Sequence, residues 1–196
     1  MILESAENYY IRGNNRRLSI LGYYDNEKKE KLTYAINYYT KAIELHPNFI
    51  EALYWRGYSK RWFADITLDK LPHLEGHKSS IDLKIIIVHY ADALKDYDAV
   101  INLNSNHEDA LQDRSSLKNF IHDFSGALDD CNRLLLLKPN SGKAFALRGE
   151  IKFYASDYIG VIEDGERALL LDPDISPIDL FIDAAKSRLK KQQKTN

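Results

Sequence analysis

Apolar and polar positions alternate along the chain with the period of amphipathic helices, in blocks that can be aligned with one another. Four blocks share the pattern: AINYYTKAIELHPN (35–48), ALKDYDAVINLNSN (93–106), ALDDCNRLLLLKPN (127–140) and VIEDGERALLLDPD (161–174). Each begins with Ala or Val and ends with Pro or Ser followed by Asn or Asp. The last three blocks start 34 residues apart. A repeat of this length predicts a helical unit copied along the chain, which forms a stack rather than a single globular core.

A second block precedes each of these and is repeated as well. It reads AENYYIRG (6–13), IEALYWRG (50–57), EDALQDRS (108–115) and GKAFALRG (142–149). Small residues at its last position are expected where two helices approach closely. The position before it always holds an arginine: Arg12, Arg56, Arg114 and Arg148. Four arginines at one place in the repeat predict a structural contact that is made four times.

The periodicity and the capping residues predict nine helices. They cover residues 4–22, 26–46, 49–64, 80–104, 107–120, 123–137, 141–154, 157–171 and 176–192. The last helix has apolar residues on one face and lysines on the other. We therefore expect it to cover the open end of the stack.

The first two copies carry insertions between their blocks, of 10 and 24 residues relative to the last two copies. We expect the first insertion to lengthen both helices of its copy around a turn near 22–26. The second contains Pro72 and Gly76, which predict a loop, followed by an apolar segment at 81–88. This segment either packs on the lengthened first copy or projects and forms a homodimer contact.

The aligned blocks resemble the tetratricopeptide repeat family. The helix–turn–helix unit of that family has a bulky residue, a small residue one turn later, then Ala, an aromatic residue, Ala and a final Pro. Cys131 and Gly165 depart from the pattern at the aromatic position, and Ser105 departs at the proline. The resemblance implies an all-α, right-handed α-solenoid in a single domain over 1–196. Its four repeats would lie at about 6–48, 50–106, 108–140 and 142–174, and its capping helix at 176–192.

In such a family member the first helix of each repeat lines a concave groove, and this too is implied by the resemblance. Of the 13 tyrosines, 11 fall within residues 9–97, and Tyr and Arg dominate binding hot spots. The groove residues expected in the first two repeats are Tyr10, Asn14, Arg17, Tyr54, Tyr58 and Arg61. Those expected in the last two are Asp109, Gln112, Ser116, Asn119, Lys143, Ala146, Glu150 and Phe153. The alternative is that the tyrosines pack between the stretched helices.

Some family members grip the C-terminal carboxylate of chaperones with a clamp of Lys, Asn and Arg. Asn14 matches one clamp position and Lys143 could mimic another, but Asp109 and Asp113 stand where cations are needed. Two acids there would repel a carboxylate, so we do not expect a complete clamp.

The composition narrows the function further. A net charge of −2 in 196 residues argues against nucleic acid as the main partner. The single cysteine, Cys131, excludes an internal disulfide and is expected to be a small apolar filler. The start of the chain lacks the pattern of a signal peptide, and no apolar run approaches the length of a membrane span. We therefore expect a cytoplasmic protein that does not contact a membrane.

The sequence contains no phosphate-binding loop, nucleophile elbow or paired-cysteine motif. His73 and His77 have the spacing of a metal pair on a helix, but they flank Gly76 and have no evident third ligand. The pairs Asp129–Asp130 and Glu163–Asp164 are expected to be a solvated surface. We therefore expect neither an enzyme nor a bound cofactor or metal.

The function that these features favour is a protein–protein interaction module, an adaptor or scaffold that holds a peptide or helix of another protein in its groove. Two alternatives remain open. One is a self-associating structural protein that uses the apolar helix of the second repeat. The other is a regulatory subunit that binds a small ligand under the insertion loop.

Overall fold

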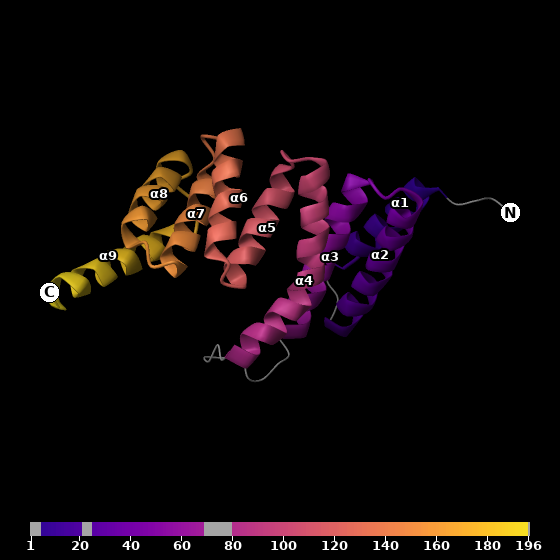
Figure 1. The fold of residues 1–196 in the computed structure, drawn as a ribbon, viewed down its shortest axis with the longest axis horizontal. Coiled ribbons are helices and arrows are strands. Elements are labelled where there is room, and N and C mark those ends of the chain that lie inside the picture. The colour runs from indigo at the N-terminus through magenta and orange to yellow at the C-terminus, as the bar shows by residue number, and fades with distance from the viewer. Residues whose placement is uncertain (1–4, 21–24, 69–79, 196) are drawn as a thin grey trace. The chain divides into compact units, whose positions relative to one another are not determined.

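The computed structural model describes residues 5–20, 25–68 and 80–195, and for residues 25, 26, 68, 80–87, 89, 194 and 195 it describes the backbone alone. These residues form nine α-helices and no strand (Figure 1). The helices are α1 (Ala6–Leu18), α2 (Asp25–Leu45), α3 (Ile50–Leu68), α4 (Ser80–Leu103), α5 (Glu108–Phe120), α6 (Phe124–Leu137), α7 (Gly142–Tyr154), α8 (Tyr158–Leu171) and α9 (Ile178–Thr195). The nine predicted helices are confirmed, with bounds that agree to within four residues.

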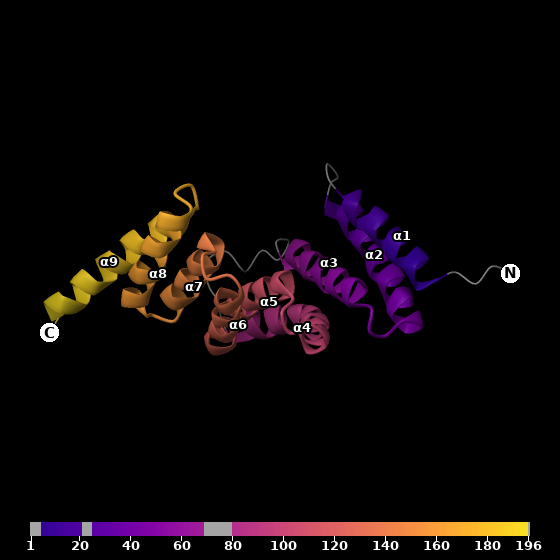
Figure 2. The same ribbon diagram turned by 90° about the horizontal axis from the view of Figure 1, so that it is seen from above.

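The helices are grouped in two compact units, Met1–Ala110 and Leu111–Asn196. In the first unit α1 packs against α2, α2 against α3, and α3 against α4. In the second unit α6 packs against α7 and α7 against α8, while α9 contacts both α7 and α8. Figures 1 and 2 show this side-by-side packing, for example of α1 with α2 and of α8 with α9. Most of α5 belongs to the second unit.

The first insertion lengthens only one helix, so the expectation that it lengthens both is wrong for α1. This helix has 13 residues, as α5 and α7 do, whereas α2 has 21 against 14 in α6 and α8. Ser19 ends α1 by satisfying carbonyl groups of its last turn: its backbone N–H donates to Asn15 O at 3.2 Å, and its Oγ donates to Arg16 O at 2.8 Å. Residues 22–24 of the turn expected near 22–26 lie outside the described residues, and the expectation is wrong for Asp25 and Asn26, which belong to α2.

The second insertion lengthens both helices of its copy, to 19 residues in α3 and 24 in α4. The loop expected around Pro72 and Gly76 lies outside the described residues, as do His73 and His77. The side chains of the apolar segment at 81–87 lie outside them as well. Val88, the last residue of that segment, is 71% exposed.

Small residues face large ones where the two helices of a repeat meet. A Cβ added to Gly13 would lie 2.6 Å from Cε1 of the buried Tyr39, so the ring packs directly on the backbone of α1. In the third repeat the positions of Gly13 and Tyr39 are held by two side chains of intermediate size, Ser115 and Cys131, with Ser115 Oγ 3.1 Å from Cys131 Sγ. Cys131 is fully buried, as expected of an apolar filler, and burial raises its pKa to about 11.

Gly165 stands where the repeat pattern has an aromatic residue, and the capping helix α9 fills the space of that side chain. A Cβ at this position would lie 2.6 Å from Ile182 Cγ1 of α9. Ile182 and its neighbour on the same face, Ile178, are both buried. The apolar face of α9 therefore occupies the space that an aromatic side chain would need, which confirms the expected capping role.

Three of the four arginines of the repeat column form the same buried ion pair. The pairs are Arg56–Asp96, Arg114–Asp130 and Arg148–Asp164, each joined by a lysine four residues after the arginine (Lys60, Lys118 and Lys152). In every pair Nε and Nη2 donate to the two carboxylate oxygens at 2.6–3.0 Å, and the lysine Nζ lies 2.8–3.0 Å from the same carboxylate. The aspartates are only 3–4% exposed. The predicted structural role of the column is confirmed in these three copies; in the first copy Tyr38 stands at the position of the acid.

These contacts correct the interpretation of the paired acids as a solvated surface. Asp129 and Glu163 are exposed, but their neighbours Asp130 and Asp164 are buried. Successive residues on a helix point about 100° apart, so one acid of each pair faces solvent while the other faces the first helix of its repeat.

Two of the arginines also reach the preceding repeat. Arg56 Nη1 donates to Thr40 Oγ1 on α2 at 3.4 Å, and Arg148 Nη1 donates to Asn132 Oδ1 on α6 at 2.8 Å. Each of these guanidinium groups therefore links three helices within its unit.

Replacing Asp130 with Asn should lower the free energy of unfolding by about 3 kcal/mol, because it leaves Arg114 and Lys118 without the carboxylate that neutralises them. Urea denaturation followed by circular dichroism measures the change. Asp129→Asn, at the exposed neighbouring position, is the matched control and should change stability by less than about 0.5 kcal/mol. Equal effects of the two substitutions would contradict the stabilising role of the buried pair.

Candidate functional site

The six groove residues predicted in the first two repeats all belong to the first unit, three on α1 and three on α3. Asn14 accepts a hydrogen bond from Tyr39 Oη at 2.8 Å, and the Arg17 guanidinium lies 3.7 Å from the ring centre of Trp55. This stacking joins the two helices, while the Arg17 Nε atom is buried without a hydrogen-bond partner among the described residues. Burial raises the pKa of Tyr39 to about 12, so its hydroxyl remains a donor at neutral pH.

The predicted tyrosines differ in how much of them a ligand could reach. Tyr54 is 6% exposed and packs between Trp55, Tyr58, Tyr97 and His107. Tyr10 and Tyr58 are half-buried, as is Arg61. Tyr54 therefore serves packing in this unit, which is the alternative left open for the tyrosines, whereas the binding role of the other residues stays a prediction.

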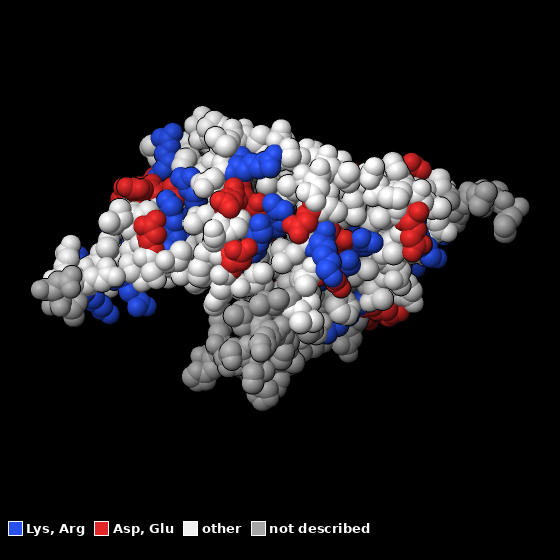
Figure 3. All heavy atoms as spheres, in the orientation of Figure 1, with Lys and Arg blue, Asp and Glu red and all other residues white. Residues whose placement is uncertain are grey.

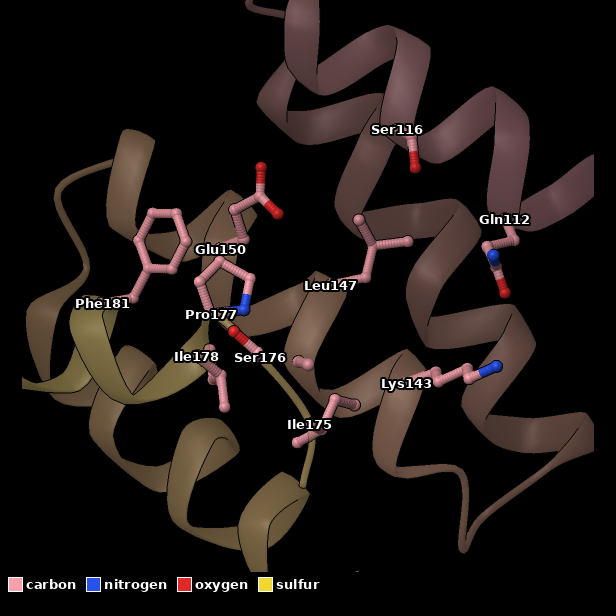
Figure 4. Close-up of a pocket in the computed structure, with 11 residues that line it drawn as sticks. Gln112, Ser116, Lys143, Leu147, Glu150, Ile175, Ser176, Pro177, Ile178 and Phe181 are labelled. Atoms are coloured by element: carbon pink, nitrogen blue, oxygen red, sulfur yellow. The ribbon is translucent and has the colours of Figure 1, made fainter. Parts of the chain in front are cut away.

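The second unit contains a pocket of about 310 Å³ on the first helices of its two repeats (Figure 4). Its lining residues are Gln112 and Ser116 from α5, Lys143, Ala146, Leu147 and Glu150 from α7, and Ile175, Ser176, Pro177, Ile178 and Phe181 from the turn before α9 and from α9 itself. The family resemblance implied a shared groove face for Gln112, Ser116, Lys143, Ala146 and Glu150, and these residues line the pocket together. Asp109, Asn119 and Phe153, which were expected on the same face, do not line it.

The sequence did not predict the wall formed by residues 175–181, because the apolar pattern of that segment indicated only a helix that covers the end of the stack. The Ser176–Pro177 peptide bond is cis, and the turn around it lies over α7 beside Glu150 and Leu147 (Figure 4). The signal that could have revealed this wall is the aromatic Phe181 within the apolar segment that follows Pro177. The end helix thus closes the pocket on one side in addition to covering the repeat.

Opposite charges lie at the two ends of the pocket. Lys143 is exposed at one end, and the Glu150 carboxylate lies at the other, near Pro177 and Phe181 (Figure 4). Both belong to α7 and are seven residues, or two helical turns, apart. Leu147, Pro177 and Phe181 provide apolar surface between and beside them.

Glu150 is a half-buried carboxylate with little compensation from the protein. Its one hydrogen bond among the described residues is accepted from Asn119 Nδ2 at 3.4 Å, and no cation of the described residues forms an ion pair with it. Burial raises the pKa of Glu150, because removal from water disfavours the charged form. Burial and the neighbouring Glu150 charge also raise the pKa of Tyr154.

Charges of both signs lie next to one another over α6 and over α8 (Figure 3). This face of the second unit therefore presents mixed charges instead of a continuous basic surface of the kind that binds phosphates. Within the described residues no group of three His, Cys, Asp or Glu side chains could hold a metal ion. None of the described helices combines the length and the apolar character needed to cross a bilayer.

Several solved structures resemble the chain. MamA from Desulfovibrio magneticus RS-1 has a TM-score of 0.73 at 18% sequence identity, over 99% of this chain and 90% of that chain. A tetratricopeptide repeat protein from Parabacteroides merdae has a TM-score of 0.64 at 16% identity, over 95% of this chain and 63% of that chain. The first TPR of Spaghetti (RPAP3), solved with an HSP90 peptide bound, has a TM-score of 0.50 at 20% identity, over 59% of this chain and 98% of that chain.

Neither a protein-family model nor a curated protein sequence matches the chain. At identities this low the structural likeness shows the fold, and function has to be argued from the site itself.

Replacing Glu150 with Gln should raise the melting temperature at pH 7 by about 1–3 °C, because folding no longer has to remove this charge from water. The raised pKa sets the direction of the pH dependence: the folded chain favours the protonated form, so the destabilisation is present when Glu150 is ionised and disappears as pH falls and both states protonate. The gain should therefore shrink towards zero below about pH 4.3, the ordinary pKa of glutamate.

Differential scanning calorimetry of the wild-type chain and the variant between pH 4 and pH 8 measures this gain. Glu163→Gln, on the exposed face of α8, is the matched control and should not change the melting temperature appreciably. A lower melting temperature for Glu150→Gln at pH 7 would show that the protein stabilises the carboxylate instead.

Proposed function

We propose that this chain, which has the tetratricopeptide repeat fold, is a protein-interaction module that holds a peptide segment of another protein in the pocket of its second unit. The binding would be an equilibrium on a preformed surface and would involve no covalent step. An adaptor or scaffold role in the cytoplasm is the wider setting that this function would fit.

The observation that carries the proposal is the composition of the pocket. Apolar groups of Leu147, Pro177 and Phe181 lie between two charged ends, and the volume of about 310 Å³ is suited to one or two side chains of a peptide. These residues lie on or next to α5, α7 and α9, so the protein would need little ordering when a peptide binds. Less of the binding free energy would therefore be lost to the entropy of ordering.

The residues predicted in the first unit support the same function at a second place. Tyr10, Tyr58 and Arg61 are half-buried on α1 and α3, and Trp55 and Trp62 lie beside Tyr58 with ring centres 5.4 Å and 5.6 Å away. Rigid aromatic groups and arginine are frequent anchors for a bound polypeptide. The fold is also compatible with peptide binding, since the structurally similar first TPR of Spaghetti was solved with an HSP90 peptide bound.

Self-association is the second candidate, and one observation favours it. Val88 on α4 is 71% exposed and is the last residue of the apolar segment of the second insertion. Light scattering tests this candidate. If the chain is a dimer at all concentrations and Val88→Glu makes it a monomer, self-association would be better supported than peptide binding. The third possibility, a small ligand under the insertion loop, concerns residues outside the described ranges and stays a prediction.

Filling the pocket should weaken peptide binding. Peptides can be selected from a displayed library of random dodecamers on the full chain, and their affinities measured by fluorescence anisotropy. Ala146→Trp places a large ring among the lining residues, and we expect it to lower the affinity of a selected peptide at least tenfold, which corresponds to about 1.4 kcal/mol.

Ser125→Trp is the matched control, because it adds the same ring at an exposed position of α6 outside the pocket. Circular dichroism verifies that both variants fold. An unchanged affinity in Ala146→Trp, together with a loss in Tyr58→Ala, would move the binding site to the first unit.

A further inference from the structure

Resting on the proposed function, we infer that the pocket of the second unit selects a basic side chain, lysine or arginine, which is held by Glu150 beside the ring of Phe181. An acidic residue of the same bound segment lies at the Lys143 end of the pocket.

The first support is the unmatched charge of Glu150. Its carboxylate lies at the end of the pocket near Pro177 and Phe181 and accepts one long hydrogen bond, at 3.4 Å from Asn119. The two fully buried acids of this unit, Asp130 and Asp164, each have an arginine and a lysine within 3.0 Å. Glu150 lines a pocket and has no such cation beside it among the described residues, so the place of the cation is left to a ligand.

The second support is that Asn119, which donates the one hydrogen bond to the Glu150 carboxylate, is itself buried. Asn119 is 7% exposed, and its Oδ1 has no hydrogen-bond partner among the described residues. Its Nδ2 already faces Glu150, so the orientation of the amide is set by that contact. Asn119 does not line the pocket, and its contribution is to hold the Glu150 side chain through Nδ2. A neutral apolar side chain in the pocket would leave Glu150 with this one long hydrogen bond, which is costly away from water, whereas an ammonium or guanidinium group brings several donors to the carboxylate.

The third support is the aromatic group at the same end of the pocket. Phe181 lines the pocket with Glu150, and Tyr154 and Phe153 lie against Phe181 with ring centres 6.1 Å and 5.3 Å away. Ring faces attract cations, and a carboxylate next to an aromatic ring suits the charged end and the methylene stem of lysine or arginine together.

Lys143 defines the other end of the bound segment. It is exposed, and no carboxylate among the described residues forms an ion pair with it. Two helical turns separate it from Glu150, a rise of about 10 Å, which an extended peptide spans in about three residues. The preferred segment therefore carries a basic residue and an acidic residue about three positions apart.

The test uses a random dodecamer library selected on the full chain and on the Glu150→Gln variant. We expect wild-type binders to be enriched in Lys or Arg, with Asp or Glu about three positions away, and this enrichment to be lost on the variant. A selected peptide is then synthesised with its basic residue replaced by norleucine, which keeps the methylene stem and removes the charge. This replacement should lower affinity for the wild-type chain about tenfold and affinity for Glu150→Gln less than twofold.

Glu163→Gln provides the matched control, since it removes an exposed carboxylate of the same unit and should leave the preference intact. Binders without basic enrichment, or an equal loss with norleucine on the wild-type chain and on Glu150→Gln, would overturn the inference while leaving peptide binding in place. A selection that yields no binder, or binders unaffected by Ala146→Trp, contradicts the proposed function itself and the inference with it.

Discussion

The buried pair between an arginine of the first helix and an aspartate of the second is the contact on which three of the four repeats depend. An aspartate that is 3–4% exposed would be strongly destabilising alone, and it is tolerated because two guanidinium donors and a lysine meet it at 2.6–3.0 Å. The bidentate geometry fixes the rotation of the two helices about their axes as well as their separation. Because Arg56 and Arg148 also bind the preceding repeat, the same contact carries the orientation from one helix pair to the next.

Helix packing in each repeat follows from how much space the close approach of two helices leaves. A glycine on the first helix accommodates a tyrosine ring in the first repeat, and Ser115 with Cys131 fills the same place with two medium-sized groups. In the fourth repeat the facing residue is Gly165, and isoleucines of α9 enter from outside. Glycine at position 165, in place of the aromatic residue of the pattern, therefore allows the capping helix α9 to pack closely on α8. The packed α9 places Phe181 and the turn at Pro177 at the edge of the pocket.

The acid in the pocket is less well neutralised than the aspartates that pair with the repeated arginines. The column pairs every buried acid, whereas Glu150 is withdrawn from solvent with one long hydrogen bond next to an unpartnered Asn119 oxygen. Such an arrangement lowers stability in the free protein and is a common property of surfaces that bind something else. The apolar groups beside it and the exposed lysine two turns away provide the remaining contacts of a peptide site.

Repetition was readable from the sequence because packing selects the same residue types at the same places in every copy. The nine helices, the structural role of the arginine column, the buried cysteine and the capping helix all follow from that regularity. Features without a repeated signal could not be predicted in this way. Which acid of a pair is buried depends on the rotation of its helix, and the length of α1 depends on a cap at Ser19. The face of α5 and α7 that lines the pocket was implied by the family resemblance, but the pocket itself was decided by tertiary structure, because its other wall forms only when α9 folds back on α7 and residues 175–181 come to lie beside Glu150.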